Sequence, residues 1–265
     1  MSKFDFIIDG IVFSYSSVST YDTCPYSFKL NYIDRLPGEG NFYSDYGSLT
    51  HEVMEQFFKG NLEPYELSGF YLDKFEEFVV NEPPAFHVDA INKYRDSGLE
   101  FFDNFSFDRD AYDVIDIETR IDGNIGGINC TGRPDLVLRR KADKKVILYD
   151  YKTSAPFWKD RKTGEEKRDI KKIEGYHKQM YLYGFMLREF KNIKVDEITL
   201  WFTRANKEVT IKYDKKKEKQ VIDWLQKTID RIKNDEEFKY NNSETFFCDN
   251  ICNVREYCEF RFNNR

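Results

Sequence analysis

Apolar and polar positions follow two different spacings along the chain, and together they predict a mixture of strands and helices. The clearest strand is residues 146–152, Val-Ile-Leu-Tyr-Asp-Tyr-Lys, where an apolar run ends in two charged residues. Two further apolar stretches flank Asn206 and Lys207 and predict a hairpin. The expected strands are 111–119, 127–130, 136–139, 146–152, 197–204 and 208–213, with a short strand or hairpin at 4–13.

Helices are expected where apolar residues recur every three or four positions, as Val53 and Phe57 do. Near the start of the chain, Ser17 is expected to cap a helix, and Pro25 to begin the next one. The expected longer helices are 47–59, 66–80, 88–105, 174–190 and 217–233.

The polar stretch 154–172 separates the clearest strand from a long helix and is expected to be a mobile loop. Helices therefore precede and follow a run of strands. This order predicts an α/β fold, a central mixed sheet flanked by helices.

Charged residues gather where the predicted strands end. Side chains alternate along a strand, so Asp150 and Lys152 share one face and Tyr151 points to the other. A second acid, Asp135, follows a Gly-Arg-Pro turn after another short strand. Carboxylates are hard ligands for divalent cations, and a fixed lysine can stabilise charge on a phosphate. The pattern predicts a divalent-metal site that acts on phosphate.

Two helices carry further polar side chains at a spacing of one turn. His51 precedes Glu55 by four residues, and Gln179 precedes Tyr183 by four. An imidazole can complete a carboxylate metal site, although an isolated histidine is more often structural. Gln179 and Tyr183 are either polar residues of an amphipathic helix or hydrogen-bond donors to substrate. Glu118 is equally a metal ligand or a surface charge.

Five cysteines form a second signal. Cys24 lies near the N-terminus, Cys248, Cys252 and Cys258 lie near the C-terminus, and Cys130 falls in a strand as a small core residue. Four thiolates can hold zinc or an iron–sulfur cluster. Paired Cys-x2-Cys turns, typical of zinc, are absent from the sequence, which favours a four-iron cluster.

Composition sets wider bounds. The 265 residues fit one large domain, and 17% aromatic residues argue against disorder. A net charge of −6 argues against coating nucleic acid by bulk electrostatics, so binding would need local basic segments, at 139–145, 159–172 or 215–219. Each of these is more simply a solvated face. The sequence has no apolar run of about 20 residues and no secretory pattern at its start, so a cytoplasmic location without membrane contact is expected, or host cytoplasm if a phage encodes the chain.

In this order, the motifs resemble the RecB-like branch of the PD-(D/E)XK nuclease superfamily. The likeness is strongest to its iron–sulfur members, namely CRISPR-associated RecB-like exonucleases, AddB-type nuclease domains and phage relatives. It spans nearly the whole chain, and no single motif would be specific without the others. The residues that carry it are Ser17, Ser19, Tyr21, Cys24 and Pro25; Gly47 to His51; Gly132 to Asp135; Asp150 to Thr153; Gln179 and Tyr183; and Cys248, Cys252 and Cys258.

The resemblance implies a restriction-endonuclease-like core and assigns roles to its residues. His51, Asp135, Asp150 and the Tyr151 carbonyl would ligate Mg²⁺ or Mn²⁺. Lys152 would position the attacking water and stabilise charge, and Gln179 and Tyr183 would orient the substrate. Cys24, Cys248, Cys252 and Cys258 would hold a [4Fe–4S] cluster, or Zn²⁺ as the alternative.

Residues 1–265 would form a single nuclease domain, in which 1–30 and 246–265 together make the cluster region. The chain departs from the family pattern in one respect. Three residues, instead of the usual two, separate Cys248 from Cys252, which bears on the cluster geometry.

The expected activity is metal-dependent hydrolysis of DNA, exonucleolytic on single strands or duplex ends, in recombination, repair or phage DNA processing. A helicase, a recombinase or a CRISPR adaptation protein would be the partner. The first alternative is a non-catalytic DNA-end-binding or assembly module, which would be expected to lack the acidic or lysine motifs that this chain retains. A relative that cuts RNA is the second, and the cysteine set speaks against it.

Overall fold

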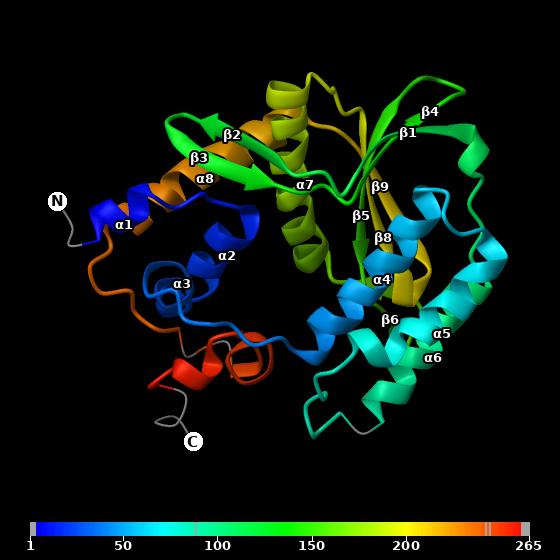
Figure 1. Ribbon diagram of the computed structural model, residues 1–265, viewed down its shortest axis with the longest axis horizontal. Helices are drawn as coiled ribbons and strands as arrows, with labels where there is room; N and C mark the ends of the chain where they lie inside the picture. The colour runs from blue at the N-terminus through cyan, green and yellow to red at the C-terminus, as the bar shows by residue number, and fades with distance from the viewer. Residues whose placement is uncertain (1–3, 88, 242, 244, 261–265) are drawn as a thin grey trace. The chain divides into compact units, whose positions relative to one another are not determined.

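The computed structural model describes residues 4–87, 89–241, 243 and 245–260 (Figure 1). Its chain divides into two compact units, each built from segments distant in sequence. Unit 1 consists of Met1–Asn41, Asp122–Gly132 and Lys219–Arg265, and unit 2 of Phe42–Ile121 and Arg133–Glu218. Residues 1–3 and 261–265 of the expected cluster region lie outside the described residues.

Unit 2 contains the mixed sheet that the strand pattern predicts. Its strand order is β1-β4-β5-β8-β9, and every neighbouring pair is antiparallel except β5 and β8, which are parallel. The strands are β1 (Tyr112–Ile117), β4 (Leu136–Arg140), β5 (Val146–Lys152), β8 (Glu197–Phe202) and β9 (Lys207–Lys212).

Helices cover both faces of this sheet (Figure 1). α4 (Phe42–Phe58), α5 (Leu67–Phe78) and α6 (Ala90–Asp103) lie on one side of β5, and α7 (Ile170–Lys191) lies on the other. Helix α8 (Lys215–Asn234) begins in unit 2 and continues into unit 1. The α/β architecture with flanking helices is therefore confirmed.

Unit 2 also contains three short helices, η2 (Pro64–Glu66), η3 (Arg109–Ala111) and η4 (Thr203–Ala205).

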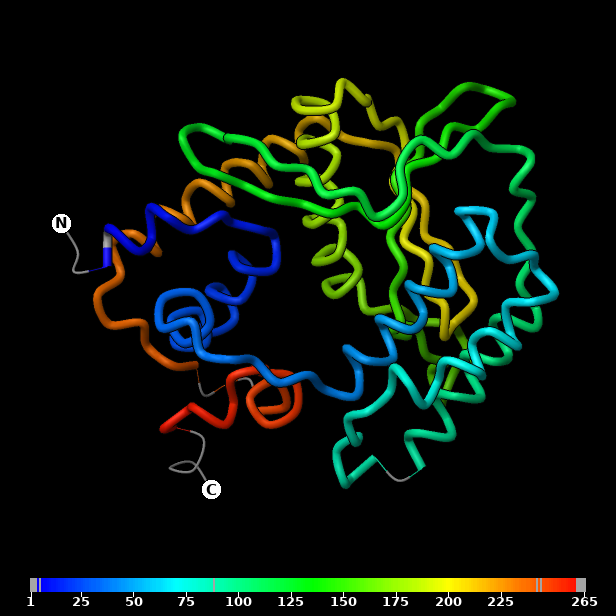
Figure 2. Tube along the Cα trace, viewed as in Figure 1, coloured from blue at the N-terminus to red at the C-terminus, as the bar shows by residue number. Residues whose placement is uncertain are grey.

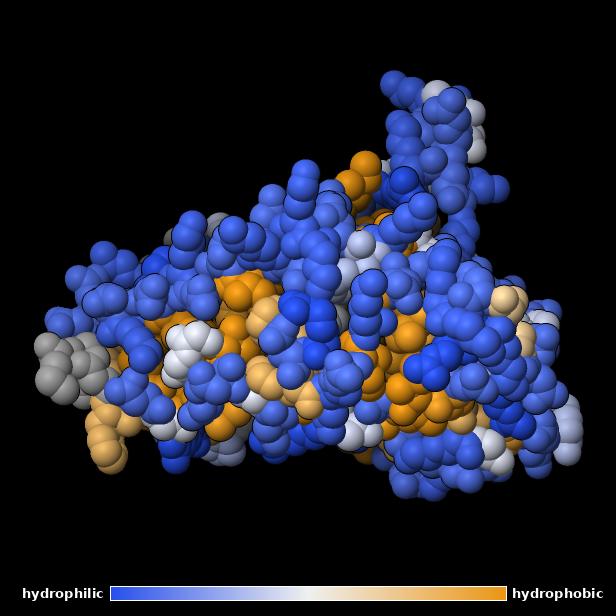
Figure 3. Space-filling model, turned by 90° about the horizontal axis from the view of Figure 1, so that it is seen from above, coloured by the Kyte–Doolittle hydropathy of each residue, from blue (hydrophilic) through white to orange (hydrophobic). Residues whose placement is uncertain are grey.

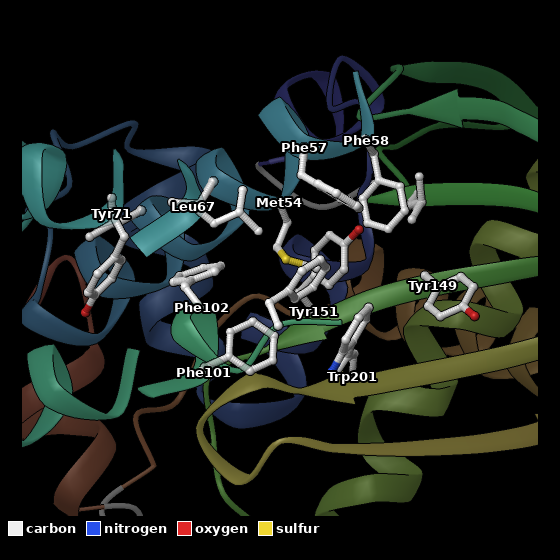
Figure 4. Close-up of a cluster of buried hydrophobic side chains, with 14 of the residues drawn as sticks. Met54, Phe57, Phe58, Leu67, Tyr71, Phe101, Phe102, Tyr149, Tyr151 and Trp201 are labelled. Carbon is white, nitrogen blue, oxygen red and sulfur yellow. The ribbon is translucent and has the colours of Figure 1, made fainter. Parts of the chain in front are cut away.

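The alternation of side chains along β5 assigns its two faces to different tasks. Tyr149 and Tyr151 enter an aromatic cluster with Trp201 and the side chains of α4, α5 and α6 (Figure 4). Lys152 points to the opposite face, where it donates a hydrogen bond to Gln179 of α7. The aromatic cluster fixes the strand, and the strand in turn fixes its charged end.

The expected loop at 154–172 instead contains a hairpin, β6 (Phe157–Lys159) and β7 (Glu166–Arg168). Its turn is stabilised locally, because Asp160 accepts backbone hydrogen bonds from Lys162 and Thr163 and Gly164 adopts a φ of +71°. Polar composition alone suggested a loop, but these turn residues allow two short polar strands to pair.

Unit 1 is mostly helical and corrects one expectation. Residues 4–13 do not form a strand or hairpin: Asp5–Asp9 is helix α1, and Phe13 makes an isolated bridge to Cys130. The apolar pattern of this segment was too short to distinguish the two-residue period of a strand from the 3.6-residue period of a helix. The other elements are α2 (Tyr15–Thr23), α3 (Pro25–Phe28), η1 (Lys29–Ile33), β2 (Ile121–Ile125), β3 (Ile128–Gly132), η5 (Phe247–Ile251) and η6 (Arg255–Tyr257).

Two segments from opposite parts of the sequence lie side by side within unit 1 (Figure 2). Cys252 and Val254 pack against Leu30 in one apolar cluster. Asn31 and Asn253 exchange side-chain hydrogen bonds of 3.2 and 2.7 Å. Residues from the two ends of the sequence thus contact each other directly.

Hydrophilic side chains cover much of the face seen in Figure 3, with apolar residues in patches between them. Among the helices of the described residues, none combines the length and the apolar character that a bilayer crossing demands.

Candidate functional site

The site in unit 2 begins where β4 and β5 stop pairing. The last paired residues are Leu136 and Tyr149. One residue before β4, the Asp135 carboxylate replaces the missing backbone acceptor and receives the Tyr151 N–H at 2.8 Å. Asp135 is buried, with 7% of its surface exposed, so this carboxylate is held in one place beside the end of β5.

Helix α4 brings His51 to the same place. Its Nε2 donates to the Tyr151 carbonyl at 3.2 Å. Its Nδ1 lies 3.6 Å from Asp135 Oδ2 and 3.4 Å from Glu118 Oε1. Glu55, one helical turn further on, pairs with Lys59 instead. Of the pair His51 and Glu55, the histidine is the one that reaches the acids.

Glu118 follows β1 and is fixed by the Gly-Arg-Pro-Asp turn. Its backbone N–H donates to the Asp135 carbonyl at 3.1 Å, and Arg133 Nε lies 2.6 Å from the Glu118 carbonyl and 3.0 Å from Oε2. The backbone of Glu118 adopts a φ of +51°, which is unusual for a residue other than glycine. Such strain persists when the surroundings enforce it, as they do at many functional sites. The sequence left the role of Glu118 open, and it placed Arg133 in a motif without giving this side chain a role of its own.

On the α7 face, Asp150 and Lys152 form a buried ion pair. Their Oδ2 and Nζ atoms lie 2.6 Å apart, and the Asp150 side chain is only 2% exposed. Lys152 Nζ also donates to Gln179 Oε1 at 3.3 Å, and Gln179 Nε2 donates to the Tyr183 hydroxyl at 3.0 Å. The predicted pair on α7 therefore fixes the direction of the lysine.

The charges influence each other strongly. Burial raises the pKa of Asp150 to about 6 against the lowering effect of Lys152, and burial also raises the pKa of Asp135. For His51, burial alone would lower the pKa, but Asp135 and Glu118 outweigh it and raise the pKa to about 9. The raised pKa values of Asp135 and Asp150 mean that these two buried carboxylates are costly to ionise together, and a cation would relieve that cost.

The donor set fits a divalent cation. His51, Glu118 and Asp135 each offer a ligand atom, and these atoms all lie within 4.8 Å of one another. Carboxylate oxygens with one imidazole suit Mg²⁺ or Mn²⁺. Asp150, a predicted ligand, is not part of this triad and faces Lys152 in the structure.

Metal affinity should depend on pH in a defined direction. With its pKa raised to about 9, His51 is protonated at neutral pH and must lose a proton to bind a metal. The apparent affinity for Mn²⁺ should therefore increase with pH between about 6 and 9, by up to about tenfold per unit for one displaced proton. Calorimetric titrations at several pH values measure this slope. In His51→Gln, which keeps an oxygen ligand without a titrating group, the slope should flatten; an unchanged slope would remove His51 from the site.

Unit 1 contains a separate cavity of about 90 Å³. Cys24, Cys248, Cys252 and Cys258 all line it, together with apolar residues such as Leu30. The fifth cysteine, Cys130, is not among the lining residues. Burial, together with the nearby Cys24, Cys252 and Cys258, raises the pKa of Cys248 to about 11. A positive centre would be needed to keep these sulfurs ionised together.

Residues 12–259 match the family model of the PD-(D/E)XK nuclease superfamily. The chain belongs to the PD-(D/E)XK nuclease superfamily. These nucleases use divalent metals, and the acid–histidine triad of unit 2 is the corresponding candidate site.

Two solved structures are similar in outline. One, described as a "putative exonuclease" from Eubacterium rectale, has a TM-score of 0.49 and 16% identity and covers 96% of this nuclease and 88% of its own chain. SSO0001 has a TM-score of 0.37 and 16% identity, over 94% and 86% of the two chains. At these values the two likenesses assign no function. None of the curated proteins matches significantly.

Proposed function

We propose that this PD-(D/E)XK nuclease is a deoxyribonuclease that uses Mg²⁺ or Mn²⁺ to digest single-stranded DNA or duplex ends from a terminus. The observation that carries the proposal is the convergence in unit 2 of His51, Asp135 and the Asp150–Lys152 pair around the end of β5. His51, Glu118, Asp135 and the Tyr151 carbonyl would hold the cation, with Asp150 beside it.

The chain supplies orientation and charge at this site. A divalent cation bound here would make a water more acidic and offset the charge of the scissile phosphate. Burial alone would lower the pKa of Lys152, but Asp150 and Asp135 outweigh it and the pKa lies above its usual value. Lys152 therefore remains a cation at neutral pH and stabilises negative charge on the phosphate instead of removing a proton.

Neighbouring groups keep Lys152 from swinging away. Gln179 accepts from its ammonium group, and the Tyr176 ring lies 5.0 Å from Nζ. Tyr176 is in turn hydrogen-bonded to Ser154 at 3.0 Å. Such positioning is needed because a charge displaced by about 1 Å loses much of its effect on the reaction.

Digestion from an end is tested with linear and circular single-stranded DNA of the same sequence. With Mn²⁺, the linear strand should be degraded progressively and the covalently closed circle should persist, whereas EDTA should protect both. Cutting of the circle at the rate of the linear strand would indicate an endonuclease. If both the linear and the circular DNA stayed intact with Mn²⁺ as well as with EDTA, the alternative would be favoured, namely a DNA-end-binding module without activity.

We further infer that the four cysteines of unit 1 hold a [4Fe–4S] cluster, which would place the chain in the RecB-like iron–sulfur branch. Support comes from the cavity that all four line and from the direct contacts between the two end segments around it. Hydrogen bonds surround the sulfurs: the Asn241 N–H donates to Cys24 Sγ at 3.5 Å, and Ser27 Oγ lies 3.5 Å from Cys252 Sγ. Zinc is the alternative occupant.

A further inference from the structure

The β6–β7 hairpin presents a large aromatic side chain to solvent. Trp158 is 51% exposed, and residues 161–172, which follow it, are all exposed. Burying a tryptophan side chain is strongly favourable, so one left half exposed on a strand of a surface hairpin is a candidate contact for a partner molecule.

The base of the hairpin is anchored beside the nuclease site. Phe157 packs edge-on against Phe202 with ring centroids 5.2 Å apart, and Phe202 pairs with Lys152 across β8 and β5. Lys207 adds an ion pair to Glu166 of the hairpin. Since neighbouring residues of a strand point to opposite faces, anchoring Phe157 directs Trp158 away from the sheet.

The hairpin is basic within an acidic chain. Residues 157–172 contain seven lysines and arginines and four acids, whereas the whole chain has a net charge of −6. The acids are largely engaged: Asp160 binds Lys167 and the turn backbone, and Asp169 accepts the Lys172 N–H. Within the part of the chain that the structure describes, no ion pair engages the following cations: Lys159, Arg161, Lys162 and Arg168.

We propose that the β6–β7 hairpin binds single-stranded DNA, with Trp158 stacked on an unpaired base and the unpaired cations on the neighbouring phosphates. Stacking needs a base whose face is free, which a single strand offers and the interior of a duplex does not. The basic side chains bind phosphates without reading sequence. This inference rests on the proposed function and specifies its substrate: the hairpin selects an unpaired strand next to Lys152.

Binding is measured first, in EDTA, where cleavage is stopped. Oligodeoxythymidine of about 12 nucleotides should quench the tryptophan fluorescence of the whole protein. Trp158→Ala should weaken binding by roughly ten- to a hundredfold, whereas Trp158→Phe should bind nearly as the parent does but lose most of the quenching. Tyr65→Ala removes a side chain that is 82% exposed outside the hairpin and should change neither.

The second measurement is the hydrolysis of a p-nitrophenyl ester of thymidine phosphate. This substrate is too small to reach the hairpin from the metal site. With Mn²⁺, Trp158→Ala should hydrolyse it at the parent rate while degrading long single strands more slowly. The hairpin proposal would be overturned if Trp158→Ala bound the oligonucleotide as tightly as the parent. It would also be overturned if the substitution weakened binding to a blunt-ended duplex, which has no single-stranded overhang, as much as binding to a single strand. Absence of ester and DNA hydrolysis in the parent protein would instead overturn the proposed function, and the binding result would stand separately.

Discussion

Lys152→Ala is expected to slow metal-dependent cleavage of single-stranded DNA by about 10²–10³-fold or more. The structure places this ammonium group 2.6 Å from Asp150 and holds it with Gln179, so removal deletes a fixed positive charge beside the site. The side chain lies outside the aromatic cluster that stabilises β5, so the variant should remain folded. Initial cleavage rates with Mn²⁺ measure the effect, and circular dichroism checks the fold.

The matched control is Lys145→Ala, at the other end of the same strand. Lys145 precedes β5, at the end opposite to Lys152, and pairs with Glu197 at 2.6 Å. Its loss removes a partly exposed ion pair, which contributes little, and should leave the cleavage rate within about twofold of the parent. Equal rates for Lys152→Ala and the parent protein would refute the assigned role.

Cys252→Ala is expected to abolish iron binding in protein purified without oxygen. The parent should be brown and contain about four irons per chain, and the variant should be colourless with less than about one. Cys252 is buried and packs with Leu30 and Val254 where the two end segments meet. Removing one of four thiolates therefore leaves the cluster with an open coordination position in an apolar wall.

Cys130→Ala serves as the matched control for this experiment. Cys130 is buried in β3 and is not among the residues that line the cavity. Its variant should keep the parent iron content, measured by elemental analysis. A colourless parent with one zinc per chain would contradict the cluster and favour the zinc alternative; iron retained in Cys252→Ala would remove this cysteine from the ligand set.

Strong local patterns were enough to predict much of unit 2. β5 has the predicted bounds, Val146–Lys152, because a continuous apolar run between charged residues has few other solutions. Its alternation also predicted that Asp150 and Lys152 share a face and that Tyr151 points away, and the ion pair and the aromatic cluster confirm this.

Weak or competing patterns were less informative. Ser17 was expected to cap α2, but Ser14 does so and Ser17 returns the hydrogen bond three residues later. Both serines belong to the same capping box, so the sequence located the helix start to within one turn.

The positions of Glu118 and Arg133 depend on tertiary contacts, which local sequence patterns do not predict. Glu118 reaches His51 because the β1–β4 pairing is irregular between Val114 and Asp116 and the backbone turns to positive φ at its own position. Neither feature is visible in the residue types. The same holds for Arg133, whose side chain fixes Glu118 from the turn that carries Asp135.

Anomalous diffraction from crystals of the protein soaked in Mn²⁺ tests the central claim most directly. The account predicts one manganese peak in unit 2 coordinated by His51, Glu118, Asp135 and the Tyr151 carbonyl, at about 2.0–2.3 Å from each ligand atom. It also predicts that the peak is lost in Asp135→Asn crystals. A peak at another position, or none beside these residues at saturating manganese, would contradict the assignment of this site.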